Sequence, residues 1–172
     1  MMRPCHALIA AAVLSACAGP EDAARRIDPR TADYADLRVF VALPGGQAPA
    51  PGSPELSIRS RSVGEGTRRA RTTLVPVADR RTPDGSVAYA VPRGELPALD
   101  AVAHGVRDAG GPGTAAVALR IEGCRMGPPD PSRRLAIAVA APGDTAPVPL
   151  IRPGTAPSPV VEAHLDAKAP CP

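Results

Sequence analysis

The segment TAAVALRIEGCRMG (residues 114–127) decides the fold, because apolar side chains recur at every second position along most of its length. A period of two places Leu119 and Ile121 on the same face of a half-buried β-strand. After Gly123 the apolar positions change parity, and the next one is Cys124. A change of parity at a glycine is typical of a β-bulge, so we predict a bulge at Gly123.

The same alternation appears in shorter segments on both sides of this strand. It predicts strands over residues 37–43, 56–59, 73–77, 87–91, 135–139 and 148–151, with residues 160–165 as either a last strand or a helical turn. Pro76 cannot donate to a strand ladder, so its strand is expected at an edge. The proline-rich residues 47–54 and 128–131 are expected to be connections. Connections this short favour antiparallel pairing.

One segment has a different period. Across residues 95–109 apolar side chains recur at steps of three and four, from Leu96 to Val106, which predicts an amphipathic helix. Pro97 suits its first turn, and the glycines that follow suit its end. The alternative is a strand over residues 101–106. Together the segments predict a mainly β (α+β) domain, either antiparallel and sandwich-like or an open sheet of short strands, with one helix.

Composition limits the core and the partners. The chain has 172 residues, enough for one domain, and its aromatic residues are two Tyr and one Phe, so the core must be aliphatic. Its 16 Gly and 23 Pro predict short elements and long loops. The formal net charge of +3 is small, so we expect no nucleic-acid partner.

The N-terminal segment has the order of a secretory signal: Arg3, an apolar run over residues 7–14, then small residues. The run is far shorter than the roughly 20 residues that a membrane-spanning helix needs. Its end, Leu14-Ser15-Ala16-Cys17, resembles the lipobox of bacterial lipoproteins, in which an aliphatic and two small residues precede an acylated cysteine. The resemblance implies that the signal peptide, residues 1–16, is removed and that the Cys17 thiol carries acyl chains such as palmitate.

Acylation would fix the location of the protein, because two or more acyl chains hold a protein stably at a bilayer. Ala18, and not Asp, follows the cysteine, which in this family implies the outer membrane, on its periplasmic face. The alternative is an ordinary signal peptide that is cut after Ala16 and carries no lipid. Residues 17–33 hold few large apolar side chains and are expected to form a flexible tether, with a single domain over residues 34–172.

Two cysteines remain after acylation, Cys124 and Cys171, and they lie 47 positions apart. Export places them in an oxidising compartment, where paired cysteines normally form a disulfide. Closing a loop of this length contributes at most about 4 kcal/mol. The alternative is a metal site shared with His104 and His164, whose spacings match no known zinc pattern.

Signatures of catalysis are missing from the sequence. The serines lie in turn sequences and not in a nucleophile elbow, and no glycine-rich loop is followed by a lysine and a helix. Lys168 is the one lysine, so a Ser–Lys pair with the usual spacing is not possible. We therefore predict no catalytic residue, no metal site and no cofactor.

One window of the chain is strongly basic. It holds seven arginines and two acidic residues, Glu65 and Asp79; the arginines are Arg59, Arg61, Arg68, Arg69, Arg71, Arg80 and Arg81. The plain interpretation is that they cover solvated strand faces and loops. The functional interpretation is a surface for an anionic partner: lipid head groups, lipopolysaccharide or an acidic protein.

These observations predict a membrane-anchored envelope lipoprotein that acts as a non-enzymatic binding or assembly module. A pilotin-like chaperone of an outer-membrane complex is an alternative that rests on size and anchoring alone. A periplasmic hydrolase with an unrecognised site is the alternative from a different class, and a concave pocket with converging acids, serine or histidine would favour it.

Overall fold

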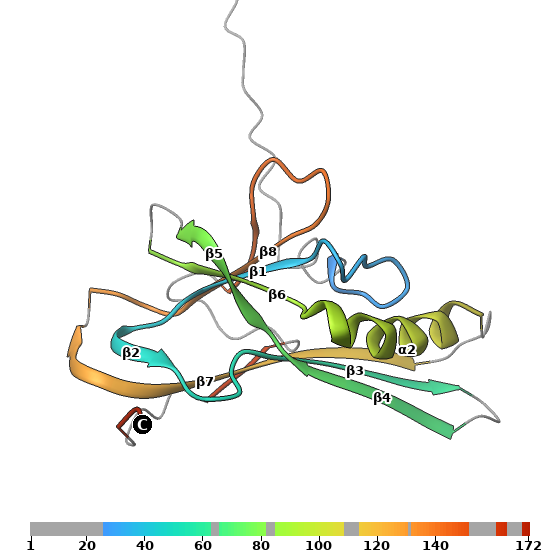
Figure 1. The fold of residues 1–172 in the computed structure, drawn as a ribbon, viewed down its shortest axis with the longest axis horizontal. Helices are drawn as coiled ribbons and strands as arrows, with labels where there is room; N and C mark the ends of the chain where they lie inside the picture. The colour runs from blue at the N-terminus through green and yellow to red at the C-terminus, as the bar shows by residue number, and fades with distance from the viewer. Residues whose placement is uncertain are drawn as a thin grey trace, which may run out of the picture.

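The computed structural model of the chain describes residues 26–62, 66–81, 85–108, 114–130, 132–151, 161–164 and 170–172. These residues form two five-stranded sheets, one short 3-10 helix and one α-helix around a shared hydrophobic core (Figure 1). The predicted fold class, mainly β with one helix, is confirmed.

The first sheet has the strand order β5-β6-β1-β8-β9. Strand β1 (Arg38–Ala42) lies at its centre and pairs antiparallel with β6 (Val87–Ala90) and β8 (Ala136–Ala140). The edges are β5 (Val75–Arg81) and β9 (Val148–Ile151). Three successive residues of β1 are buried, as expected of a central strand that is covered on both faces.

The second sheet is built along β7 (Thr114–Asp130). Strand β3 (Glu55–Ser62) pairs antiparallel with the first half of β7. Strand β2 (Gly45–Pro49) pairs antiparallel with the second half. Strand β4 (Gly66–Thr73) pairs with β3 and ends the sheet on that side. On the other side of β7 lies β10 (Val161–His164), which is parallel to it, so the pairing is not purely antiparallel.

Two sequence predictions about connections were wrong. Residues 47–54 were expected to be a loop, but β2 covers residues 45–49, and β7 continues through residues 128–130, which were expected to be a turn. Glycines permit this pairing because a Cβ at Gly45 would overlap Asp130 and one at Gly46 would overlap the carbonyl oxygen of Pro128. Pairing between distant segments here overrides the local signals of glycine and proline.

The change of parity in β7 is present in the structure. Leu119 and Ile121 are buried, and the next buried residue is Cys124. The change falls where the partner of β7 switches from β3 to β2. The recorded shift of register within the β2–β7 pair lies further along, between Gly45 and Gln47.

The segment that was predicted as one strand over residues 73–77 contains the end of β4 and the start of β5. Buried Leu74 separates them, and its N–H donates a 2.8 Å hydrogen bond to the carbonyl of Pro54. Here the chain crosses from the second sheet to the first, visible as the long green ribbon in Figure 1. The edge position expected for Pro76 is confirmed, because β5 is an edge strand.

The predicted helix is confirmed, and the alternative strand over residues 101–106 is wrong. Helix α2 (Leu96–Asp108) follows the 3-10 helix η1 (Arg93–Glu95). It buries three apolar side chains and packs on β3 and β4 (Figure 1); they are Leu99, Val102 and Ala103. In the described part of the chain, neither helix has the length and apolar character that crossing a membrane requires.

The predicted tether ends earlier than expected. Residues 26–33 were assigned to it, but Ile27 is only 2% exposed and belongs to the core, as does Ala32. The hydroxyl of Tyr34 donates a 3.1 Å hydrogen bond to the carbonyl of Ile27. Arg26 binds Asp144 through two hydrogen bonds of 2.7 Å. The folded domain therefore begins at least as early as Arg26, and residues 17–25 lie outside the described residues.

Candidate functional site

Alternation along β3 and β4 gives the second sheet an inner face and an outer face. On β3, Leu56 and Ile58 are buried while Arg59 and Arg61 are exposed. Helix α2 and the core cover the side with the buried residues. The exposed arginines therefore lie on the outer face of the sheet, away from α2.

On this outer face, side chains from three neighbouring strands surround a hollow of about 440 Å³. It is lined by Arg59, Arg61, Thr67, Arg69 and Ala116. Strand register accounts for the grouping, because both Arg69 on β4 and Ala116 on β7 are paired with Arg59 on β3. The short side chains of Thr67 and Ala116 leave space between the arginines.

The positive charge of the hollow is not balanced within the described residues. There, none of Arg59, Arg61 and Arg69 has a carboxylate partner, whereas Arg71 on the same face pairs with Glu55 at 3.4 Å. Glu65, the acidic neighbour in sequence, lies outside the described residues. Guanidinium groups present forked donors that match carboxylate and phosphate oxygens, so the arrangement suits an anion.

The pairing of Arg59 with Arg69 supports the same interpretation. The two residues are direct cross-strand partners, and such partners have Cβ atoms about 4.5–5.5 Å apart. Like charges at directly opposite positions destabilise a sheet. An anion bound between the two guanidinium groups would offset this repulsion.

The structure divides the seven arginines of the basic window between different faces. Arg59, Arg61 and Arg69 line the hollow, and Arg71 follows on the same face of β4. Arg68 points to the opposite face, where its guanidinium group lies over Gly105 of α2. Arg80 and Arg81 belong to β5 in the first sheet, and their side chains lie outside the described residues.

A second hollow of about 230 Å³ continues the outer face toward the other end of β3. Arg120 and Glu122, both on β7, form an ion pair in its lining. The backbone N–H of Glu122 donates a 2.9 Å hydrogen bond to the Ser53 hydroxyl. The sequence analysis did not single out Arg120 or Glu122, although both occupy polar positions of the alternation over residues 115–122.

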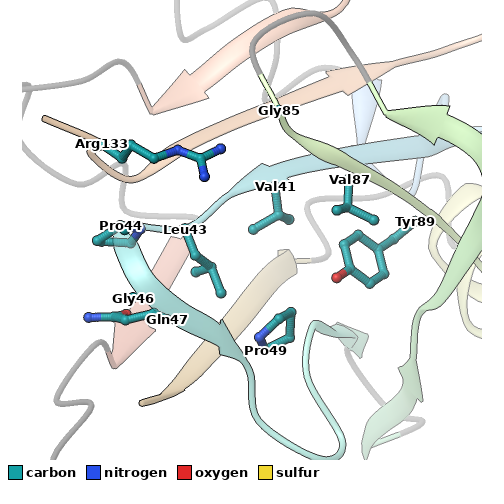
Figure 2. Close-up of a pocket in the computed structure, with 11 residues that line it drawn as sticks. Val41, Leu43, Pro44, Gly46, Gln47, Pro49, Gly85, Val87, Tyr89 and Arg133 are labelled. Carbon is teal, nitrogen blue, oxygen red and sulfur yellow. The ribbon is translucent and has the colours of Figure 1, made fainter. Parts of the chain in front are cut away.

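A smaller pocket of about 120 Å³ lies between the two sheets (Figure 2). Apolar Val41, Leu43 and Val87 line it, with Arg133 nearby and Tyr89 on the opposite side from Arg133. Burial raises the pKa of the Tyr89 hydroxyl. The volume is well below the roughly 300–1,000 Å³ of typical ligand pockets, which favours a packing defect over a binding site.

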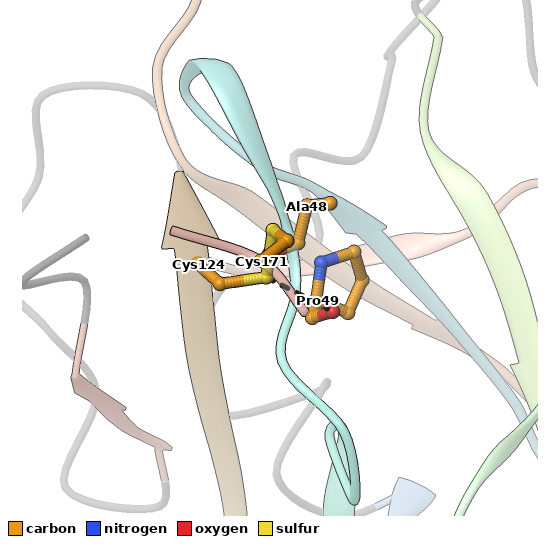
Figure 3. The surroundings of a disulfide bond; sticks show 4 residues. All are labelled: Ala48, Pro49, Cys124 and Cys171. Atoms are coloured by element: carbon orange, nitrogen blue, oxygen red, sulfur yellow. Dashed lines mark hydrogen bonds between the residues drawn. A yellow bond between two sulfur atoms is a disulfide. The ribbon is translucent and has the colours of Figure 1, made fainter. Parts of the chain in front are cut away.

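The predicted disulfide between Cys124 and Cys171 is present, with Cα atoms 4.9 Å apart (Figure 3). It attaches the C-terminal residues to β7, next to β2. The N–H of Cys171 donates a 3.0 Å hydrogen bond to the carbonyl of Arg125. The Sγ atom of Cys124 lies 3.5 Å from the carbonyl oxygen of Ala48 on β2. Cys17, the predicted acylation site, lies outside the described residues.

The alternative metal site does not fit this arrangement, because both cysteines are bonded to each other. His104 is exposed on α2, and only the backbone of His164 is described, in β10. Within the described residues, no three His, Cys, Asp or Glu side chains are grouped so that they could hold a metal ion.

Comparison with protein-family models, with curated proteins and with solved structures finds no match to this chain. Its function is therefore inferred from its own residues and their arrangement.

Proposed function

We propose that the protein is a lipid-anchored envelope lipoprotein that binds an anionic partner without catalysis. The observation that carries the binding part is the hollow lined by Arg59, Arg61 and Arg69 on the outer face of the second sheet. Among the described residues the three guanidinium groups have no carboxylate partners, and they surround open space. A positive surface of this kind raises the local concentration of anions and speeds their association.

The anchoring part rests on the sequence Leu14-Ser15-Ala16-Cys17, which resembles a lipobox. Eight residues separate Cys17 from Arg26, where the described domain begins. Even at full extension these residues span only about 30 Å, at roughly 3.3–3.6 Å per residue. Acylation at Cys17 would therefore keep the domain within about one domain diameter of the bilayer surface.

Labelled palmitate tests the anchor. We expect cells that express the full chain to incorporate the label into the protein, and the Cys17→Ser variant to lose both the label and its membrane fractionation. A protein that takes up no palmitate, and whose Cys17→Ser variant fractionates as before, would contradict the anchoring proposal.

Titration with defined anions tests the binding proposal. The acylated full chain in neutral detergent is titrated with fluorescent polyglutamate and, separately, with polyphosphate. We expect Arg59→Gln/Arg69→Gln to weaken binding about tenfold or more, because charge-assisted hydrogen bonds are lost. Arg93→Gln/Arg134→Gln removes two exposed arginines outside the hollow and should leave binding unchanged. Equal binding by both double variants would contradict the proposal.

A further inference from the structure

The N-terminal end of the described domain lies on the inner side of the second sheet, the side that α2 covers. Arg26 is fastened to Asp144 in the connection between β8 and β9, and Ile27 is buried in the core. Burial raises the pKa of the Tyr34 hydroxyl, on which the charges of Arg107 and Asp100 on α2 also act. The N-terminal segment and α2 therefore pack on the same side of β3 and β4, as Figure 1 shows.

The arginine hollow lies on the other side of that sheet. At least the thickness of the sheet and of α2 separates the two sides, and a helix with its side chains is about 10–12 Å across. At physiological ionic strength charges are screened over about 8 Å. When the domain lies with its N-terminal side against a bilayer, the head groups are therefore beyond the screened reach of the arginines. This disfavours the lipid among the predicted anionic partners.

Among the described strands, one edge without a neighbouring strand lies beside the hollow. Strand β4 pairs with β3 without interruption from Glu55↔Thr73 to Ser62↔Gly66, and it is the outermost strand on its side of the described sheet. It contains no proline, so its backbone groups follow a regular ladder. Its outer face carries Arg69 and Arg71, and the latter side chain is 71% exposed.

We propose that the arginine hollow and the edge of β4 together bind an extended acidic segment of a partner protein, which pairs with β4 as an additional strand. Alternate side chains of such a strand lie on one face, so one carboxylate would contact Arg69 and the next on that face would lie beside Arg71, which also pairs with Glu55. The same arginines repel the β4 edge of a second copy, which makes the edge selective for an acidic strand. This inference rests on the proposed anion-binding function and names the partner for it.

Synthetic peptides test strand addition. The acylated full chain in neutral detergent is titrated with a heptapeptide that alternates glutamate and valine. Controls are a peptide of the same composition with its glutamates in one block, and the alternating peptide N-methylated at every second amide. We expect each control to bind about tenfold more weakly, because pairing requires both the register and the backbone donors. Amide exchange in β4 should slow when the alternating peptide binds.

Variants connect the peptide to the hollow. We expect Arg69→Gln to weaken binding of the alternating peptide about tenfold and Arg93→Gln, an exposed arginine on η1, to have no effect. Circular dichroism checks that both variants are folded.

The outcomes separate this inference from the proposed function. Equal binding of the alternating and N-methylated peptides, with Arg69 still required, would overturn strand addition but keep anion binding. Arg69-dependent binding to phosphatidylglycerol vesicles with no peptide binding would overturn the inference in favour of a lipid partner. Binding that does not depend on Arg69 with any probe would overturn both.

Discussion

Arg59 and Arg69 face each other across β3 and β4, in a position where opposite charges or apolar residues would stabilise the sheet more. A nearby diagonal contact shows a more stable arrangement, because Arg71 on β4 pairs with Glu55 on β3. Two arginines at directly opposite positions lower the stability of the sheet, and a role in binding an anion would explain why both are present. This trade-off can be measured one residue at a time.

Arg69→Glu should stabilise the domain while it abolishes anion binding. The substitution replaces a like-charge cross-strand pair by an opposite-charge pair with Arg59, a gain of about 0.2–1 kcal/mol in the free energy of unfolding. Urea denaturation of the ligand-free protein measures it. Arg71→Glu is the matched control and should lower stability, because it places a carboxylate beside Glu55. Destabilisation by Arg69→Glu would show that the pair is not repulsive.

Gly46→Ala should destabilise the protein much more than Gly52→Ala. Both glycines have φ of +81°, a conformation that costs a residue with a Cβ on the order of 1–3 kcal/mol. A Cβ at Gly52 meets open space, whereas one at Gly46 overlaps the carbonyl of Pro128 on β7. The free energy of unfolding of both variants, compared with wild type, checks this. Equal losses would mean that β2 and β7 are less closely packed than described.

At the level of elements, the sequence predicts those that carry their own periodic pattern. Strand β1 and helix α2 were found because large apolar side chains recur every second, or every third and fourth, position. Strand β4 was largely missed because its sequence, GTRRARTT, contains no large apolar residue. Strand β2 was missed because its two glycines and its proline resemble a loop, and only its pairing with β7 makes it a strand.

The candidate site was predictable only in part, because strand pairing between distant segments is not visible in the local sequence. Composition marks the arginine-rich window, but the register decides which arginines share a face. Arg68 and Arg69 are neighbours in sequence and lie on opposite faces, and Arg120 joins the outer face from a distant segment. The N-terminal boundary was missed because its signals, Ile27 and a salt bridge to Asp144, depend on contacts distant in sequence.

The ion pair between Arg26 and Asp144 should make the stability of the domain depend on pH in the acid range. The hydrogen bond from Arg26 holds the pKa of the Asp144 carboxyl below its usual value. Stabilisation from this pair is therefore fully present above about pH 4, the pKa of an unfolded aspartate, and is lost as the pH falls through the lower folded value. Asp144→Asn should lower the urea midpoint at pH 7 and reduce its acid dependence below pH 4. An unchanged pH profile would contradict this role for Asp144.

At the scale of the whole molecule, the disulfide joins the C-terminal residues to the strand on which the second sheet is built. Cys124→Ala/Cys171→Ala should lower the free energy of unfolding by at most about 4 kcal/mol, from the greater entropy of the unfolded chain. Wild type under reducing conditions should lose a similar amount, whereas the double variant should not respond to reductant. A reductant effect on the double variant would show that another group is responsible.

At the same scale, Arg26, the first described residue, and the arginine hollow lie on opposite sides of the second sheet. In-cell photo-crosslinking tests the binding claim most directly, with a photoreactive residue in place of Thr73, exposed on β4, or of Ala101, exposed on α2. The account predicts a protein adduct from position 73, and not from position 101, that contains an acidic peptide and disappears in Arg59→Gln/Arg69→Gln. An adduct at position 73 that persists in the double variant, or a lipid adduct there, would contradict it.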